Sequence, residues 1–247
     1  MWPKPSGKAW QFMNATCKPK FDSLDALEAE LQEMGPHSQE YWDKQVHVVP
    51  QSKTVEREKF ILDRCTGKTV LHIGCTGPLD AAMRKVAKRC YGIDKEPSER
   101  TYYAAFDLDR CAHGIDPAEF PRFPDVEIIV CGEVLEHLSN PGRFLDFLHV
   151  VYDVPVIFTV PNAFSSGSIG WLKRGYENVN VEHVAWYSWH TIKILLKRHG
   201  YEISDFFWYG GNPLFSEGLI VVCGNKQPDV AAINAEAFGN SGISDAT

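Results

Sequence analysis

From about residue 51 onward, short β-branched runs alternate with apolar residues at helical spacing. The runs predict strands at Thr69–Ile73, Cys90–Ile93, Ala104–Phe106, Val126–Cys131 and Val154–Val160. Apolar residues spaced three and four positions apart follow most of these runs and predict helices between the strands. Because strands that alternate with helices pair side by side in parallel, the pattern predicts a parallel sheet with helices on both faces.

Two further strands are predicted near the carboxyl end, at Tyr201–Tyr209 and Leu219–Cys223. A Gly- and Pro-containing loop separates them, which is typical of an antiparallel pair. The helix before them is predicted to begin after an N-cap at Ser188 and to end at Gly200. The expected fold class is therefore α/β: a doubly wound, mostly parallel seven-stranded sheet with a C-terminal antiparallel strand pair.

The segments outside the alternating pattern set the expected domain boundaries. Residues 1–50 predict an N-terminal extension with one helix, and residues 51–225 predict the main domain, which opens with a helix over Lys53–Cys65. Residues 226–247 are rich in Ala, Asn, Gly and Ser, which is typical of a mobile tail.

Composition and charge restrict the class of partner. Hydrophobic residues make up 44% of the 247 positions, as in ordinary globular proteins, and no apolar run approaches the ~20 residues that span a bilayer. The seven cysteines contain no C-x-x-C pair and predict reduced thiols in a cytoplasmic protein without a membrane anchor. The net charge of −7 disfavours nucleic acid as a partner and favours a small or neutral one.

Candidate ligand-binding residues follow the predicted strands, at the edge where parallel sheets bind ligands. The first strand leads into a turn with Gly74, Cys75 and Gly77, and the second ends at Asp94, where a carboxylate can accept both hydroxyl hydrogens of a ribose. Each feature alone could serve packing or helix capping. The ordered set favours a nucleoside cofactor, and it continues with Asp107, Leu108, Cys131 and Glu133.

The chain resembles the class I S-adenosylmethionine-dependent methyltransferases, from about Lys68 to Cys223. The resemblance is carried by VLHIGCTG, YGID, VEIIVCGEVLEHLSNPGRFL, FTVPN and EHVAWYSWHTIKILLKRHGY. It is strongest to the methyltransferase type 11 and 23 group, which includes ubiquinone-biosynthesis O-methyltransferases. The resemblance implies a Rossmann-like fold, S-adenosyl-L-methionine as cofactor, and a cofactor site made of His72, Gly74, Cys75, Gly77, Asp94, Asp107, Leu108, Cys131 and Glu133.

Two positions depart from the family's pattern. His72 stands where the family usually has an acidic residue, and the glycine loop GCTG is one residue shorter than the common GCGTG. A catalytically inactive relative is therefore an alternative reading. A dinucleotide-dependent oxidoreductase is disfavoured because the loop lacks the G-x-G-x-x-G spacing.

A metal site is predicted from Glu133, Glu136 and His137, which lie at i, i+3 and i+4 and would share one face of a helix. Together with His183 they could hold Mg²⁺ or Mn²⁺. The arrangement resembles that of the ribose 2′-O-methyltransferases of small-RNA 3′ ends, where a metal would lower the pKa of the attacking hydroxyl. Similar strings also occur without metal, and His137 or His183 is then the candidate general base.

The methyl acceptor is expected to contact the long polar segment Ala163–Val181. Aromatic and basic side chains in it could stack on and hydrogen-bond an aromatic ring or a sugar, or simply pack on the domain: Trp171, Lys173, Arg174 and Tyr176. The predicted function is O-methylation of a small molecule, sugar or glycan hydroxyl. The alternatives are a metal-dependent RNA ribose 2′-O-methyltransferase and an inactive methyltransferase-like binding protein.

Overall fold

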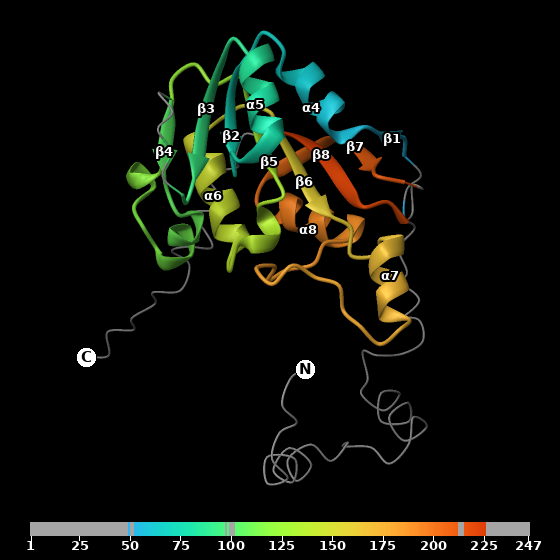
Figure 1. Ribbon diagram of the computed structural model, residues 1–247. Helices are drawn as coiled ribbons and strands as arrows, with labels where there is room; N and C mark the ends of the chain where they lie inside the picture. The colour runs from blue at the N-terminus through green and yellow to red at the C-terminus, as the bar shows by residue number, and fades with distance from the viewer. Residues whose placement is uncertain (1–48, 50–51, 97, 99–101, 212–214, 226–247) are drawn as a thin grey trace, which may run out of the picture. The chain divides into compact units, whose positions relative to one another are not determined.

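The computed structural model describes residues 49, 52–96, 98, 102–211 and 215–225 (Figure 1). The helix predicted in the N-terminal extension and the predicted tail 226–247 lie outside the described residues. Within the described part of the chain, no helix is both long and apolar enough to cross a membrane.

One mixed sheet runs through the domain in the order β1-β7-β8-β6-β5-β2-β3-β4. β8 is antiparallel to both of its neighbours, and all other pairings are parallel. The predicted doubly wound sheet with a C-terminal antiparallel pair is therefore confirmed. The strands are β1 (Thr54–Val55), β2 (Thr69–Ile73), β3 (Arg89–Asp94), β4 (Tyr103–Ala105), β5 (Ile128–Gly132), β6 (Val156–Pro161), β7 (Tyr201–Tyr209) and β8 (Gly218–Asn225).

β1 is an eighth strand that the sequence pattern did not predict. The predicted helix from Lys53 begins only at Arg57, because the residues before it pair with the edge of the sheet. The amide of Trp208 donates to the Lys53 carbonyl at 3.1 Å, and Thr54–Val55 run parallel to the end of β7. A strand of two residues is too short to produce a recognisable alternation of apolar and polar positions.

Helices cover both faces of the sheet, as predicted (Figure 1). On one face, α4 and α5 bury Phe60, Ile61 and Met83 against Val70 and its neighbours. On the other, α6 and α8 pack in a larger core that includes Leu71. The helices are α4 (Arg57–Cys65), α5 (Gly77–Val86), α6 (Pro141–Val151), α7 (Ser166–Leu172) and α8 (Trp189–Arg198), with 3₁₀ turns η1 (Leu108–His113), η2 (Pro117–Glu119) and η3 (Leu135–His137).

The predicted start of α8 is confirmed. The Ser188 hydroxyl accepts from the Thr191 amide at 3.3 Å, and the Thr191 hydroxyl accepts from the Ser188 amide at 2.8 Å. This reciprocal pair is a capping box, which satisfies amides that the first turn of a helix leaves without partners.

The helix predicted from Glu133 is wrong. Glu133 has a left-handed backbone with φ of 56°, and its amide donates to the Thr159 carbonyl at 2.9 Å, which extends the pairing of β5 with β6. A helix cannot begin there, so only the single 3₁₀ turn η3 follows. α6 starts after Asn140, whose side chain accepts from the Arg143 amide at 3.1 Å.

The chain order places a ligand crevice beside β2. From β2 the chain continues to β3 and β4 on one side, and it then returns to β5 and β6 on the other. Ligands of doubly wound sheets bind outside the carboxyl ends of the strands at such a reversal.

Candidate active site

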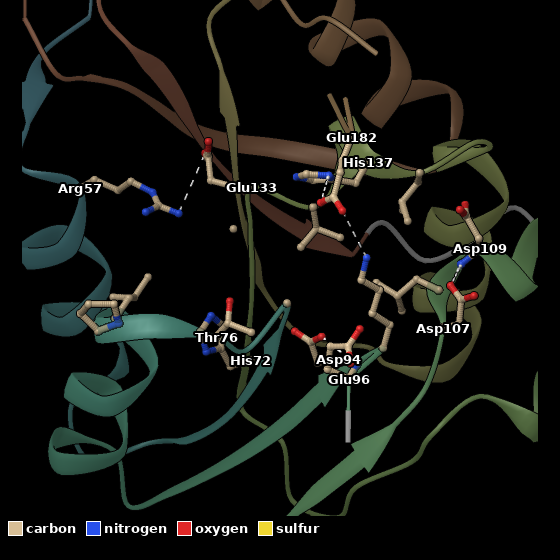
Figure 2. Close-up of a pocket in the computed structure, with 18 of the residues that line it drawn as sticks. Arg57, His72, Thr76, Asp94, Glu96, Asp107, Asp109, Glu133, His137 and Glu182 are labelled. Atoms are coloured by element: carbon tan, nitrogen blue, oxygen red, sulfur yellow. Dashed lines mark hydrogen bonds and ion pairs between the residues drawn. The ribbon is translucent and has the colours of Figure 1, made fainter. Parts of the chain in front are cut away.

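A cavity of about 500 Å³ lies at this reversal (Figure 2). Its volume is within the usual range of small-molecule sites, about 300–1,000 Å³. The predicted cofactor residues that line it are His72, Gly74, Asp94, Asp107, Leu108 and Glu133. Cys75, Gly77 and Cys131 do not line it: both cysteine side chains are completely buried, and Gly77 begins α5.

Gly74 is the position where only glycine fits. Its φ is 73°, and a Cβ atom there would lie 2.5 Å from Cγ2 of Val134. Glycine adopts this backbone without strain and lets the chain pass close to a ligand. The short loop still forms one wall of the cavity, because Thr76 at its end and Pro78 in the first turn of α5 line it.

Two carboxylates follow β3 and β4 at the cavity edge. Asp94 ends β3, and its Oδ1 accepts from the Glu96 amide at 3.2 Å. Asp107 caps η1 by accepting from the Asp109 amide at 3.0 Å, and the largely buried Leu108 follows it on the wall. A carboxylate beside an apolar surface suits an adenine, which offers an amino group and a ring face.

His72 is held by a residue that the sequence analysis missed. Its Nδ1 lies 3.1 Å from Oδ1 of Asp80, and the two side chains are only 3% and 2% exposed. The Arg84 guanidinium donates to the other Asp80 oxygen at 3.0 Å. The sequence signal for Asp80 was a carboxylate between Leu79 and Met83 on the buried face of α5.

Arg57 and Glu133 meet on one wall of the cavity. Arg57 donates to Oγ1 of Thr159 at 3.1 and 3.0 Å, and the Thr159 hydroxyl donates to Glu133 at 2.9 Å. The Tyr209 hydroxyl also donates to Glu133, at 2.8 Å. Burial, and then the charge of Glu133, raise the pKa of Tyr209 and keep it a protonated donor. A guanidinium at this wall can pair with a carboxylate of a bound molecule.

Three of the four predicted metal ligands converge, and Glu133 is not among them. Ligand atoms of Glu136, His137 and His183 all lie within 4.8 Å of one another, whereas the Glu133 side chain points toward Arg57 (Figure 2). The separation follows from the left-handed backbone at Glu133, which turns its side chain away from the face that a helix would have shared. A further carboxylate lies beside these three residues: Oε2 of Glu182 is 3.9 Å from Nδ1 of His137.

Glu136 is buried with its carboxylate uncompensated. Its side chain is 1% exposed, and neither oxygen has a hydrogen-bond partner among the described residues. Burial, and then Glu133, raise its pKa to about 8. An uncompensated buried carboxylate is costly unless a positive charge or a proton meets it.

Backbone hydrogen bonds bring His183 to this carboxylate. The Glu136 carbonyl accepts from the amides of Val184 and Ala185 at 2.8 and 3.2 Å. The His137 and His183 rings then lie 4.6 Å apart in an edge-to-face arrangement. Burial, and then the charge of His137, lower the pKa of His183. His183 is therefore kept neutral, the form that can accept a proton or bind a metal.

The aromatic and basic residues predicted to bind the acceptor lie elsewhere. Trp171 and Tyr176 are 44% and 64% exposed and contact each other edge to face. Arg174 lies 5.5 Å from the centre of the Trp171 ring. These residues and Lys173 are not part of the wall of the cavity.

The glycine turn, the carboxylates after β3 and β4 and the order of the sheet together define a class I S-adenosylmethionine-dependent methyltransferase. A family described as a methyltransferase domain matches residues 44–205, and the chain belongs to this family. S-adenosylmethionine is accordingly its cofactor. The ubiquinone-biosynthesis subgroup stays a prediction.

Solved structures show the same fold. The small RNA methyltransferase HEN1 superposes with a TM-score of 0.55 and 15% identity, over 74% of this chain and 27% of the HEN1 chain. A 1,6-didemethyltoxoflavin-N1-methyltransferase of Burkholderia thailandensis gives 0.50 and 12%, over 69% of this chain and 77% of its own. The chain thus spans about a quarter of HEN1. No curated protein matches it.

Proposed function

We propose that the protein transfers a methyl group from S-adenosylmethionine to a hydroxyl of a small molecule or sugar, next to a divalent cation held by Glu136, His137 and His183. The observation that carries the proposal is the buried Glu136 carboxylate, which has no partner among the described residues and lies beside two imidazoles. Carboxylate oxygens and imidazole nitrogens are ligands of Mn²⁺ and, for the oxygens, of Mg²⁺.

The cavity residues fit the parts of the cofactor. Asp94 would accept from the ribose hydroxyls, and Asp107 with Leu108 would contact the adenine. Arg57 would pair with the carboxylate of the methionine part, since its guanidinium lies on the opposite wall, beside Gly132. With the cofactor held in this way, the sulfonium would lie between the glycine turn and the His137 side of the cavity.

The reaction itself needs alignment and removal of one proton. S-adenosylmethionine supplies a methyl already bonded to a positively charged sulfur; the carbon–sulfur bond breaks as a bond to the acceptor oxygen forms. A cation at the cluster would lower the pKa of the acceptor hydroxyl. In the absence of a metal, neutral His183 or its neighbour His137 would accept the hydroxyl proton as general base.

The cofactor part is tested by titrating S-adenosylhomocysteine into the full chain by calorimetry, with Asp94→Ala as the variant. We expect binding that weakens about tenfold or more when the hydrogen bonds to the ribose are lost. Absence of binding to the wild-type chain would make the inactive relative, with His72 and the shortened loop as the cause, the better description.

The cation part is tested by titrating Mn²⁺ and following its electron paramagnetic resonance signal. Glu136→Gln and His183→Ala should each abolish binding. Glu133→Gln is the matched control, because its carboxylate is used by Thr159 and Tyr209 and should leave Mn²⁺ affinity unchanged. Equal loss in the Glu133 variant would restore the four-ligand set expected from the sequence, and unchanged binding in the Glu136 variant would refute the site.

RNA ribose 2′-O-methylation is the second candidate. It is favoured by the likeness to HEN1, a small RNA methyltransferase, although that likeness covers 27% of the HEN1 chain. It is disfavoured by the net charge of −7, because affinity for nucleic acid comes largely from basic residues that neutralise phosphates.

A further inference from the structure

A second, smaller cavity has His183 in its wall. It has a volume of about 110 Å³ and is bounded by the end of β6, the first turn of α7, the segment 178–187 and Glu217. His183 lines this second cavity, whereas His137 and Glu182 line the cofactor cavity. The centres of the His137 and His183 rings are 4.6 Å apart, so the two cavities have neighbouring histidines in their walls.

Buried hydrogen bonds fix the wall of the second cavity. Asn162 is 3% exposed; its amide nitrogen donates to the Ser216 carbonyl at 2.9 Å, and its oxygen accepts from the Phe164 amide at 3.1 Å. The Ser165 hydroxyl caps α7 by accepting from the Ser168 amide at 3.1 Å. The Asn162 side chain thus joins the end of β6 to the loop at Ser216, and these side chains are already used within the protein.

Other polar groups of the same wall are available to a ligand. The Asn178 amide, the Glu217 carboxylate and the Trp186 indole make no hydrogen bond or ion pair with the rest of the described chain. They offer donors, acceptors and one aromatic face, with Trp186 41% exposed. This set matches a ring that carries several hydroxyls on its edge and C–H groups on its face.

The charges of the wall select against an anionic ligand. Among the described residues that line the second cavity there is no lysine or arginine, and Glu217 is acidic. A phosphate or carboxylate would meet this charge without a lysine or arginine of the described wall to pair with it. The second cavity, at about 110 Å³, is much smaller than the cofactor cavity of about 500 Å³, which favours a single ring over a larger molecule.

From this placement we infer that the second cavity is the acceptor site, and that it takes one ring of a neutral, hydroxyl-rich molecule such as a glycoside. The ring would direct a hydroxyl past His183 toward the methyl group in the cofactor cavity. The inference rests on the proposed function for the direction of transfer. It also assigns the aromatic contact with the acceptor to Trp186. The sequence analysis expected Trp171 and Tyr176 in that role, but neither lines either cavity.

The experiment uses the full chain labelled with 5-fluorotryptophan and loaded with S-adenosylhomocysteine. The fluorine resonances of Trp186 and Trp171 are assigned with Trp186→Phe and Trp171→Phe. Methyl β-D-ribofuranoside and methyl α-D-glucopyranoside are then titrated as neutral probes, and ribose 5-phosphate as an anionic one. Trp171 is a matched internal control, because the two indoles are 44% and 41% exposed.

We expect at least one neutral glycoside to shift the Trp186 resonance and leave the Trp171 resonance in place. Glu217→Gln should weaken that binding about tenfold, whereas Glu177→Gln, on the exposed surface nearby, should not change it. No shift of Trp186 with either glycoside, or a stronger response to ribose 5-phosphate, would overturn the inference. Failure of S-adenosylhomocysteine to bind in the loading step would instead refute the proposed function.

Discussion

Replacing Asp80 with alanine tests whether the buried His72–Asp80 pair holds the floor of the cofactor cavity. The carboxylate accepts from Nδ1 of His72 at 3.1 Å, and both side chains are 2–3% exposed. After the substitution the His72 imidazole still lines the cavity, but its Nδ1 loses the Asp80 oxygen as acceptor. Its proton is then free to move to the other ring nitrogen, which changes the group that His72 presents to the cofactor.

The cost can be estimated from the burial of the pair. A buried donor that loses its partner destabilises a fold by about 1–3 kcal/mol. The bond from Arg84 to the same carboxylate adds little, because the Arg84 side chain is 50% exposed and an exposed ion pair is worth at most about 1 kcal/mol. For a domain of this size, the loss of the buried bond alone lowers the melting temperature by about 2–12 °C.

Urea unfolding and S-adenosylhomocysteine titration of the same variants separate the two effects. Asp80→Asn keeps an oxygen acceptor for Nδ1 and should recover most of the stability. Arg84→Ala removes only the exposed ion pair between Arg84 and Asp80 and should change the free energy of unfolding by a few tenths of a kcal/mol. If Asp80→Ala unfolds within about 0.5 kcal/mol of the wild type, the reasoning from burial is wrong.

Three further predictions concern the cavity and the cluster. Gly74→Ala and Gly67→Ala should each lower the free energy of unfolding by about 1–2 kcal/mol, because φ is 73° at both positions. Only Gly74→Ala should also lose cofactor binding, because only its added Cβ contacts Val134. In chelator-treated protein, the free energy of unfolding should fall as the pH rises from 4.5 to about 8, because Glu136 keeps in the folded protein a proton that it has lost in the unfolded chain. Urea denaturation measured across this pH range should show a flatter profile for Glu136→Gln. A slope that is the same in both proteins would contradict the raised pKa. Tyr209→Phe should cost about 1 kcal/mol in urea unfolding by removing a donor to Glu133, and no change would mean that the hydrogen bond has no net value.

The sheet could be predicted from the sequence because its central strands are buried on both faces. All five residues of β2 are buried, as in a central parallel strand, and the pattern of such a run is visible without tertiary information. β1 could not be predicted, because two residues at the sheet edge carry no periodicity. The sequence could also place Asp94 and Asp107 at the cavity, because each follows a strand and ligands bind beyond the carboxyl ends of parallel strands.

The candidate cluster was predicted for a reason that proved partly incorrect. The spacing of Glu133, Glu136 and His137 was interpreted on a helix, whereas the left-handed backbone at Glu133 ends the strand there and sends its side chain to Arg57. His183 was placed correctly although no local pattern dictates it; its position comes from hydrogen bonds between chain segments. Arg57 and Asp80 were missed because each acts through a contact with a residue far along the chain or on a different element.

The carbonyl of Glu136 binds the amides of Val184 and Ala185, so the segment carrying His183 is attached to the segment carrying the other two cluster residues. That segment also forms a wall of the second cavity. A ligand that ordered this segment at one of the two proposed sites would therefore reduce the ordering needed at the other. By thermodynamic reciprocity, the resulting gain in affinity would be the same whichever ligand bound first.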